Sequence, residues 1–285
     1  MRCISFLTLL VATCATCFAS RTLSDELGRD VLVPDHPHRL ISLVPSVTDD
    51  VYALGAGDDI IAVSDFTKYP GEAARKPSIG TSLTPSIESI VSLHPDLVIA
   101  SAETNREETV HQLEYLGVAV FVLNPHGIEG ILSSILSLGK ALGREESATR
   151  VVSELRARLK TVEVRVETKP LIRVFMPIWY DPVVTIGKHA FITEFIRAAG
   201  GRSVTDDLNQ EWPEISLETV IERNPDALLL MKGSKMTLDE IEVRSGWKTL
   251  EAIRSHHVYL VDERIQLPSP VAFDAMEDLA KQLHP

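Results

Sequence analysis

The chain has 285 residues, of which 45% are hydrophobic and 24% charged. This balance is typical of a globular protein, and nothing in it indicates a disordered chain. With 28 basic and 40 acidic side chains, the formal net charge is −12. An acidic chain without a basic stripe is a poor match for nucleic acid or anionic lipid, so neither is expected as a partner.

The N-terminal segment differs from the rest of the chain. Met1 and Arg2 supply a positive end, and the sequence is then almost free of polar groups as far as Phe18. About 16 apolar residues are short for a membrane span, so this pattern predicts a secretory signal peptide over residues 1–19. The mature protein is then expected in the periplasm or elsewhere outside the cytoplasm. A retained anchor helix is the alternative.

All three cysteines, Cys3, Cys14 and Cys17, lie inside that segment. Cleavage would leave the mature chain without thiols, which excludes disulfides and cysteine-bound metals. The four residues that end at Cys14 also resemble a lipoprotein cleavage box, although Thr13 is an unusual residue before the modified cysteine. Lipid anchoring at Cys14 therefore stays an alternative.

Short apolar runs alternate with helical patterns over residues 39–143, the first predicted lobe. A hairpin is expected before it, around Gly28. Ser46, followed by Asp49 three positions later, predicts an N-cap for the first helix. Continuous apolar runs are typical of parallel strands covered on both faces. The predicted strands are contained in LISLVPS, IIAVSDF, DLVIAS and VAVFVL.

A long helix is predicted over residues 144–169, after a shorter one that ends at Gly143. About 24 helical residues reach roughly 36 Å, so this helix can join two lobes. The α/β pattern resumes over residues 170–285, the second predicted lobe. We therefore expect two Rossmann-like α/β lobes with central parallel sheets, one long backbone helix and a ligand cleft between the lobes. The apolar face of the long helix carries Val151, Val152, Leu155, Leu159 and Val162.

One stretch occurs nearly twice. SIESIVSLHPDLVIAS begins at Ser86, and SLETVIERNPDALLLM begins at Ser216. Each has a serine suited to an N-cap, a glutamate two residues later, and a Pro-Asp pair before an apolar strand. The repeat therefore occupies the same position in both predicted lobes.

Together these segments resemble the periplasmic substrate-binding proteins with a single-helix backbone, which serve ABC importers of vitamin B12, siderophores and haem. The resemblance covers nearly all of the mature chain, including WYDPVVTIGKHAFITEFIRAAGG and WPEISLETVIERNPDALLL. The pieces SLVPSVT and IWYDP are most similar to the cobalamin-binding branch. The resemblance implies a monomer that captures cobalamin or a related corrinoid and delivers it to the membrane permease.

The resemblance also assigns a role to one glutamate of each repeat. In proteins of this kind, such glutamates dock on arginines of the permease subunits, and Glu88 and Glu218 occupy the matching positions. A carboxylate in the first turn of a helix also stabilises the helix dipole, so stabilisation alone is the alternative role.

Aromatic side chains in loops at the cleft are the expected ligand contacts, because they can stack on a flat macrocycle. Trp179 and Tyr180 follow a predicted strand, and Trp212 precedes the second repeat. Phe66 and Tyr69 occupy the equivalent loop of the first lobe.

Some positions depart from the cobalamin-binding pattern. Ser82 and Ser101 stand where some cobalamin binders have tryptophan, and Val271 replaces an arginine that is frequent in the last loop. Arg264 lies nearby as a possible substitute. Trp247 is expected to pack in the core. These departures leave a ferric siderophore or haem as the alternative ligand.

Neither catalysis nor a metal site is predicted. The sequence has no nucleophile elbow, phosphate-binding glycine loop or His-Glu-x-x-His motif. A zinc or manganese receptor would share the two-lobed design, but it would need about three imidazoles or carboxylates that converge in the cleft. No pair among the histidines near predicted loop or helix ends has ligand spacing; these are His38, His94, His111, His126 and His189.

Overall fold

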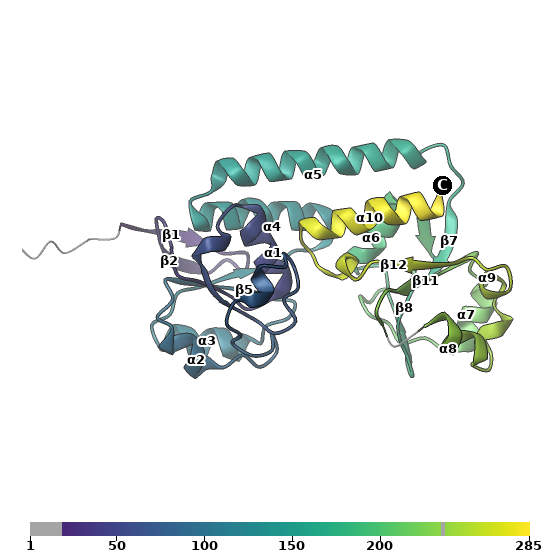
Figure 1. Cartoon of the computed structure of the whole chain (residues 1–285), viewed down its shortest axis with the longest axis horizontal. Helices are drawn as coiled ribbons and strands as arrows, with labels where there is room; N and C mark the ends of the chain where they lie inside the picture. Colours follow the sequence, from purple (N-terminus) through teal and green to yellow (C-terminus); the bar gives the residue numbers. More distant parts are fainter. Residues whose placement is uncertain (1–18, 235–236) are drawn as a thin grey trace, which may run out of the picture.

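A computed structural model describes residues 19–234 and 237–285 of the chain. Two α/β lobes lie side by side beneath a layer of long helices (Figure 1). The predicted signal peptide, including the three cysteines and the Cys14 cleavage box, lies outside the described residues except for Ala19. Among the described residues, no helix is long and apolar enough to cross a membrane.

The first lobe is built on a parallel sheet with the strand order β4-β3-β5-β6. Its strands are almost entirely buried, which explains their continuous apolar sequences. An antiparallel hairpin precedes the sheet, with Gly28 in its turn at φ +77°. The strands are β1 (Ser20–Ser24), β2 (Asp30–Pro34), β3 (Leu40–Ser42), β4 (Ile60–Val63), β5 (Leu97–Ser101) and β6 (Val120–Leu123). The helices are α1 (Pro45–Ala53), α2 (Ile87–Ser92) and α3 (Glu107–Tyr115), with 3₁₀ turns η1 (Gly57–Asp59) and η2 (Ala73–Arg75).

The second lobe has the same kind of sheet, with the order β10-β7-β11-β12 and all pairs parallel. A two-stranded hairpin of β8 and β9 stands apart from this sheet. The strands are β7 (Ile172–Phe175), β8 (Pro177–Tyr180), β9 (Val183–Thr185), β10 (Gly201–Ser203), β11 (Ala227–Met231) and β12 (Val258–Val261). The helices are α6 (Phe191–Ala198), α7 (Leu217–Arg223), α8 (Leu238–Val243) and α9 (Glu251–Arg254), with 3₁₀ turns η3 (Trp247–Thr249) and η4 (Glu263–Gln266).

The sequence repeat forms the same substructure in both lobes. Helix α2 leads into β5, which pairs with β3, and helix α7 leads into β11, which pairs with β7. The Asp96 carboxylate accepts hydrogen bonds from the backbone amides of His38 and Arg39, and the Asp226 carboxylate accepts one from the amide of Arg173. The repeated aspartates thus attach each repeat to the first strand of its sheet.

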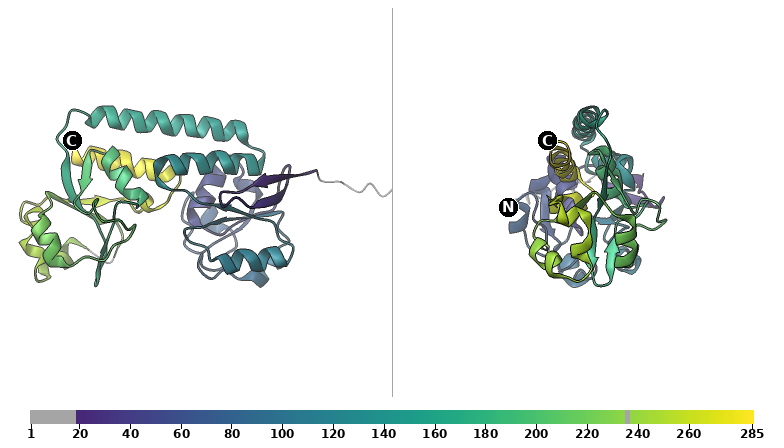
Figure 2. Two further views of the ribbon diagram at one scale, coloured as in Figure 1. Left: turned by 180° about the vertical axis from the view of Figure 1, so that it is seen from behind. Right: turned by 90° about the vertical axis from the view of Figure 1, so that its right-hand side faces the viewer.

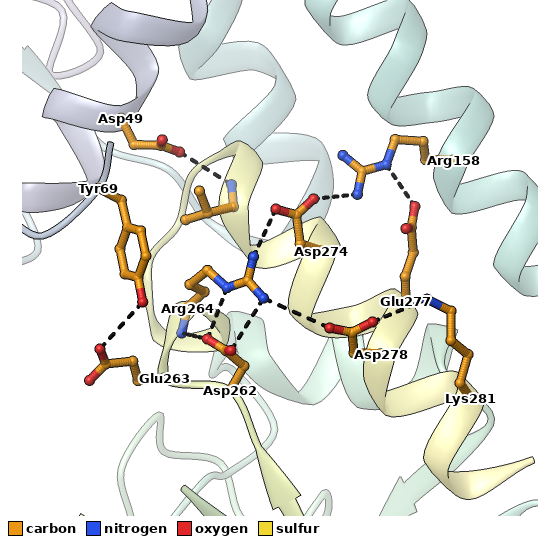
Figure 3. A network of polar contacts seen from close by, with 11 residues as sticks. Asp49, Tyr69, Arg158, Asp262, Glu263, Arg264, Asp274, Glu277, Asp278 and Lys281 are labelled. Carbon is orange, nitrogen blue, oxygen red and sulfur yellow. Dashed lines mark hydrogen bonds and ion pairs between the residues drawn. The ribbon is translucent and has the colours of Figure 1, made fainter. Parts of the chain in front are cut away.

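Three helices form the layer that spans the lobes: α4 (Gly127–Leu142), α5 (Glu145–Val166) and α10 (Pro270–Leu283). Helix α4 ends where predicted, with Gly143 at φ +64°, and a Cβ there would lie 2.8 Å from the carbonyl oxygen of Asp35. The 22 residues of α5 cover both lobes over about 33 Å (Figures 1 and 2). Arg158 of α5 donates hydrogen bonds to Glu277 (2.6 Å) and Asp274 (2.5 Å) of α10, so the two helices are tied together (Figure 3).

The hydrophobic core does not divide at the boundary between the lobes. One cluster of buried side chains runs from the first sheet, for example Ile99, through Ile135 of α4 to Phe195 of α6 and Phe273 of α10. The rings of Phe195 and Phe273 meet edge to face at 5.2 Å. A smaller cluster fills the outer part of the second lobe around Trp247, which is only 3% exposed, as predicted for a packing residue.

Two local predictions are wrong. The N-cap of α1 is Val44 rather than Ser46, because Pro45 has its φ fixed by its ring and starts the helix earlier. Asp49 consequently lies beyond the first turn, where its buried carboxylate accepts a hydrogen bond (3.2 Å) from the amide of Val271. In addition, Trp179 and Tyr180 belong to the hairpin strand β8, since β7 ends at Phe175.

Candidate functional site

A cavity of about 330 Å³ lies between the lobes. Ser101 and Glu103 reach it from the end of β5, and Phe191 reaches it from the start of α6 in the second lobe. The position agrees with the general rule that ligands of parallel α/β sheets bind beyond the carboxyl ends of the strands. Its other lining residues are Val44, Pro45, Ser46, Ser82, Thr104, Ala190, Glu211, Trp212, Gln266, Leu267 and Pro268.

Trp212 is the one predicted aromatic contact that lines this cavity. Its side chain is 44% exposed, and the loop around it is held against the strand β9 and the residues that follow. The amide of Thr185 donates to the carbonyl of Pro213 (3.0 Å), and the amide of Gly187 donates to that of Glu211 (2.8 Å). A Cβ on Gly187 would lie 2.1 Å from the carbonyl oxygen of Gln210, so only glycine permits this close approach. The backbone on both sides of Trp212 is therefore held in place before any ligand binds.

Trp179 and Tyr180 form an aromatic stack outside the lining of the cavity. Their ring centroids are 5.7 Å apart with planes 12° from parallel, and Trp179 is 50% exposed. The indole Nε1 of Trp179 donates to the carbonyl of Asp181 (2.9 Å), and the guanidinium of Arg244 lies 3.9 Å from the ring centroid of Tyr180. Their role as ligand contacts stays a prediction.

The first-lobe aromatics also lie outside the lining of the cavity. Phe66 is 80% exposed and has φ +64°. The hydroxyl of Tyr69 lies 3.5 Å from the carboxylate of Glu263, and Lys68 forms an ion pair of 2.8 Å with the same carboxylate (Figure 3 shows Tyr69 and Glu263). This loop therefore contacts the second lobe directly, and ligand contact by its aromatic side chains stays a prediction.

Two small polar residues, Ser82 and Ser101, line the cavity. Asn105 links them, because its side-chain nitrogen donates to the carbonyl of Ser82 (2.7 Å) and its side-chain oxygen accepts from the amide of Ser101 (2.8 Å). This part of the lining is thus polar, and the aromatic side chains among the described lining residues are those of Trp212 and Phe191.

The charge of the cavity comes from Glu103 and Glu211. No lysine or arginine lines it among the residues that the structure describes. Burial raises the pKa of Glu103 to about 7, and the nearby carboxylate of Glu211 adds to the rise. His126 lies beside both glutamates, an association that spacing along the sequence did not reveal.

Arg264 does not line the cavity. Its guanidinium forms ion pairs with Asp262 (2.9 Å), Asp274 (3.0 Å) and Asp278 (3.8 Å), as Figure 3 shows. These carboxylates hold it against α10, so it is not free to take the place of an arginine in the ligand site.

Glu88 and Glu218 are exposed in the first turns of α2 and α7. The hydroxyl of Ser86 accepts from the amide of Ser89 and that of Ser216 accepts from the amide of Thr219, each at 3.2 Å. Both predicted caps are confirmed. The two helices lie on the side of the molecule opposite α5 (Figure 1).

Comparison with known proteins agrees with this architecture. The family model of the periplasmic binding proteins matches residues 40–265. An uncharacterised ABC transporter substrate-binding lipoprotein, YvrC of Bacillus subtilis, is 29% identical over 93% of this chain and 85% of its own length. The vitamin B12-binding protein of Vibrio parahaemolyticus is 28% identical over 85% of this chain and 88% of its own. Among solved structures, the haem-binding protein RhuT of Roseiflexus sp. RS-1 has a TM-score of 0.80 and 25% identity, with 87% of this chain and 98% of that one covered.

The chain therefore belongs to the periplasmic binding protein family. Within that family it has the two-lobed form, with parallel sheets in both lobes and one long helix across them, as the sequence predicted.

Proposed function

We propose that this protein is the extracytoplasmic substrate-binding component of an ABC importer and that it captures cobalamin or a related corrinoid. Its relatives include an ABC substrate-binding lipoprotein and vitamin B12-binding proteins, each aligned over most of the chain. These relatives support binding without catalysis. They also support export from the cytoplasm, with a lipid on Cys14 as one possible anchor.

The charge of the cavity is the observation that favours a corrinoid. Haem carries ionised propionates and ferric siderophores are commonly anionic, so both would approach Glu103 and Glu211 without a lysine or arginine in the described lining to compensate. A corrinoid bears neutral carboxamides, and these can donate hydrogen bonds to carboxylates. Trp212 adds a flat apolar surface for the macrocycle.

The proposed mechanism is capture followed by delivery, with no bond made or broken. The ligand enters between the lobes, Trp212 and Phe191 remove part of its surface from water, and Glu103 and Glu211 accept hydrogen bonds from its amides. Trp179, Tyr180, Phe66 and Tyr69 would contact the outer parts of a ligand larger than the cavity. The protein acts as a monomer.

Tryptophan fluorescence of the purified mature protein tests this ligand assignment. In the presence of EDTA, cobalamin should quench the fluorescence saturably, whereas haem and a ferric siderophore should not. Trp212→Ala should weaken binding by about thirtyfold or more, because truncation of a hot-spot tryptophan at the centre of an interface costs about 2 kcal/mol or more. Trp179→Ala should have a smaller effect. Tight binding of haem without a response to cobalamin would favour the alternative ligand, for which the likeness to RhuT is the support.

We also propose that Glu88 and Glu218 dock on the permease. Both carboxylates are exposed, and the helices that carry them, α2 and α7, lie on one side of the molecule, away from the helical layer (Figure 1). The double variant Glu88→Gln/Glu218→Gln should abolish uptake by cells while ligand affinity stays within about twofold of the original. Glu222→Gln, a change on the same helix as Glu218, is the matched control. If uptake by the double variant is unchanged, the two glutamates do not dock on the permease, and their role is to stabilise the helix dipole.

A further inference from the structure

Three potential metal ligands converge at the cleft from segments far apart in the sequence. Glu103 follows β5, His126 follows β6, and Glu211 lies in the second lobe between β10 and α7. One ligand atom from each side chain lies within 4.8 Å of the other two. All three side chains are at least partly exposed, so an ion can reach them. A metal receptor requires such a cluster of ligands in its cleft. The spacing of these residues along the sequence did not reveal it.

The three side chains have no basic partner in the described part of the chain. None of them forms an ion pair or a side-chain hydrogen bond there, whereas Asp262 and Asp274, for example, pair with Arg264. Two carboxylates facing each other without a cation repel, and that repulsion costs free energy unless a positive charge is bound.

The backbone beneath these groups is nevertheless fixed. Glu103 lies between Ser101 and Asn105, which are hydrogen-bonded to each other, and His126 is the N-cap residue of α4. The carbonyl of Glu211 accepts a hydrogen bond from the amide of Gly187. The side chains can therefore close on an ion by rotation, without rearrangement of the chain that carries them.

We infer that, while no corrinoid occupies the cavity, Glu103, His126 and Glu211 bind a divalent transition-metal cation that joins the two lobes across the cleft. One imidazole and two carboxylates form a donor set that suits Zn²⁺, Co²⁺ or Mn²⁺. Bonds of about 2.1 Å in tetrahedral geometry place ligand atoms roughly 3.4 Å apart, a contraction within reach of side-chain rotation. Three protein ligands leave a fourth position for water or for a donor atom of a molecule in the cleft.

Calorimetric titration of the EDTA-treated, dialysed protein with ZnCl₂ or CoCl₂ tests this site in the absence of any corrinoid. We expect saturable binding of one ion per chain and, for Co²⁺, a change in visible absorption. His126→Ala, Glu103→Gln and Glu211→Gln should each weaken binding by at least about tenfold, since even loss of an outer partner of a metal ligand costs this much. Glu108→Gln, an exposed change outside the cluster, should leave it unchanged.

Two results would overturn the inference: no saturable binding of either ion, or binding of equal strength by the triple variant, which would place the ion elsewhere. Circular dichroism establishes that each variant is folded. Because corrinoid binding is measured separately in EDTA, failure of the metal site and failure of the proposed ligand are distinguishable.

Discussion

At the scale of single residues, the cleft is defined by a few side chains in unusual surroundings. Trp212 is held open to the cavity by its loop, and Glu103 faces a second carboxylate without a compensating cation in the described residues. The raised pKa of Glu103 means that its folded environment favours the protonated form. Ionisation of this side chain therefore opposes folding.

The pH dependence of stability tests this environment. The folded protein binds more protons than the unfolded chain between pH 4.5 and about 7, so this group should lower the free energy of unfolding as pH rises through that range. Glu103→Gln should be the more stable protein at pH 8, by up to about 1 kcal/mol after allowance for solvent screening. Urea unfolding in EDTA measures the difference, which should shrink towards zero below pH 4.5. A variant less stable than the original at pH 8 would contradict this account.

At the scale of elements, the repeated helices depend on their caps. Ser86 and Ser216 each satisfy an amide that would otherwise have no partner in the helix. The same short sequence therefore starts a helix at the same position in both lobes and places a glutamate in its first turn.

Removal of either cap should destabilise the protein. We expect Ser86→Ala and Ser216→Ala to lower the free energy of unfolding by about 1 kcal/mol each. Ser153→Ala, at an exposed position inside α5, is the control and should change it by less than about 0.5 kcal/mol. Chemical denaturation measures the free energy of unfolding of all three variants. If the two cap variants change it no more than the control does, the caps contribute little to stability.

At the scale of the whole molecule, the helical layer makes one body of the two lobes. Its hydrophobic cluster is continuous with both sheets, and polar contacts add to it. The carboxylate of Glu194 in α6 accepts a hydrogen bond (2.7 Å) from the amide of Ile128 at the start of α4, and Lys68 pairs with Glu263 across the lobes. Unfolding of one lobe would therefore expose the core of the other.

Phe273→Ala tests this continuity. Truncation of a fully buried phenylalanine should cost about 3–5 kcal/mol, because it leaves a cavity. The variant should still unfold in a single transition. All three tryptophans lie in the second lobe, so tryptophan fluorescence reports that lobe, while far-ultraviolet circular dichroism reports both. Separate midpoints by the two methods would show that the lobes unfold independently.

The same continuity predicts a small change of shape on ligand binding. Helices α5 and α10 lie together across the layer, and Arg158 ties them, so hinge motion should be limited. Small-angle scattering with and without cobalamin should give radii of gyration that agree within about 1 Å, compared with the larger closure expected of hinged lobes. A decrease in the radius of gyration well beyond about 1 Å would show that the helical layer does not prevent closure of the lobes.

The sequence by itself determined the features that depend on neighbouring residues. Continuous apolar runs predicted the parallel strands, serine caps predicted α2 and α7, and Gly143 predicted the end of α4. The repeat also predicted the matching architecture of the lobes. These signals are local, because capping, helix periodicity and backbone freedom act within a few residues.

Only the tertiary structure decided what meets in the cleft. The cluster of Glu103, His126 and Glu211 is drawn from three segments of two lobes. Their spacing along the chain therefore could not predict that they lie together. Likewise, Asp49 resembles a capping residue in sequence but is partnered by Val271 of the other lobe. Packing across the lobes determines such pairs, and it depends on how two sheets and a helical layer fit together rather than on local preference.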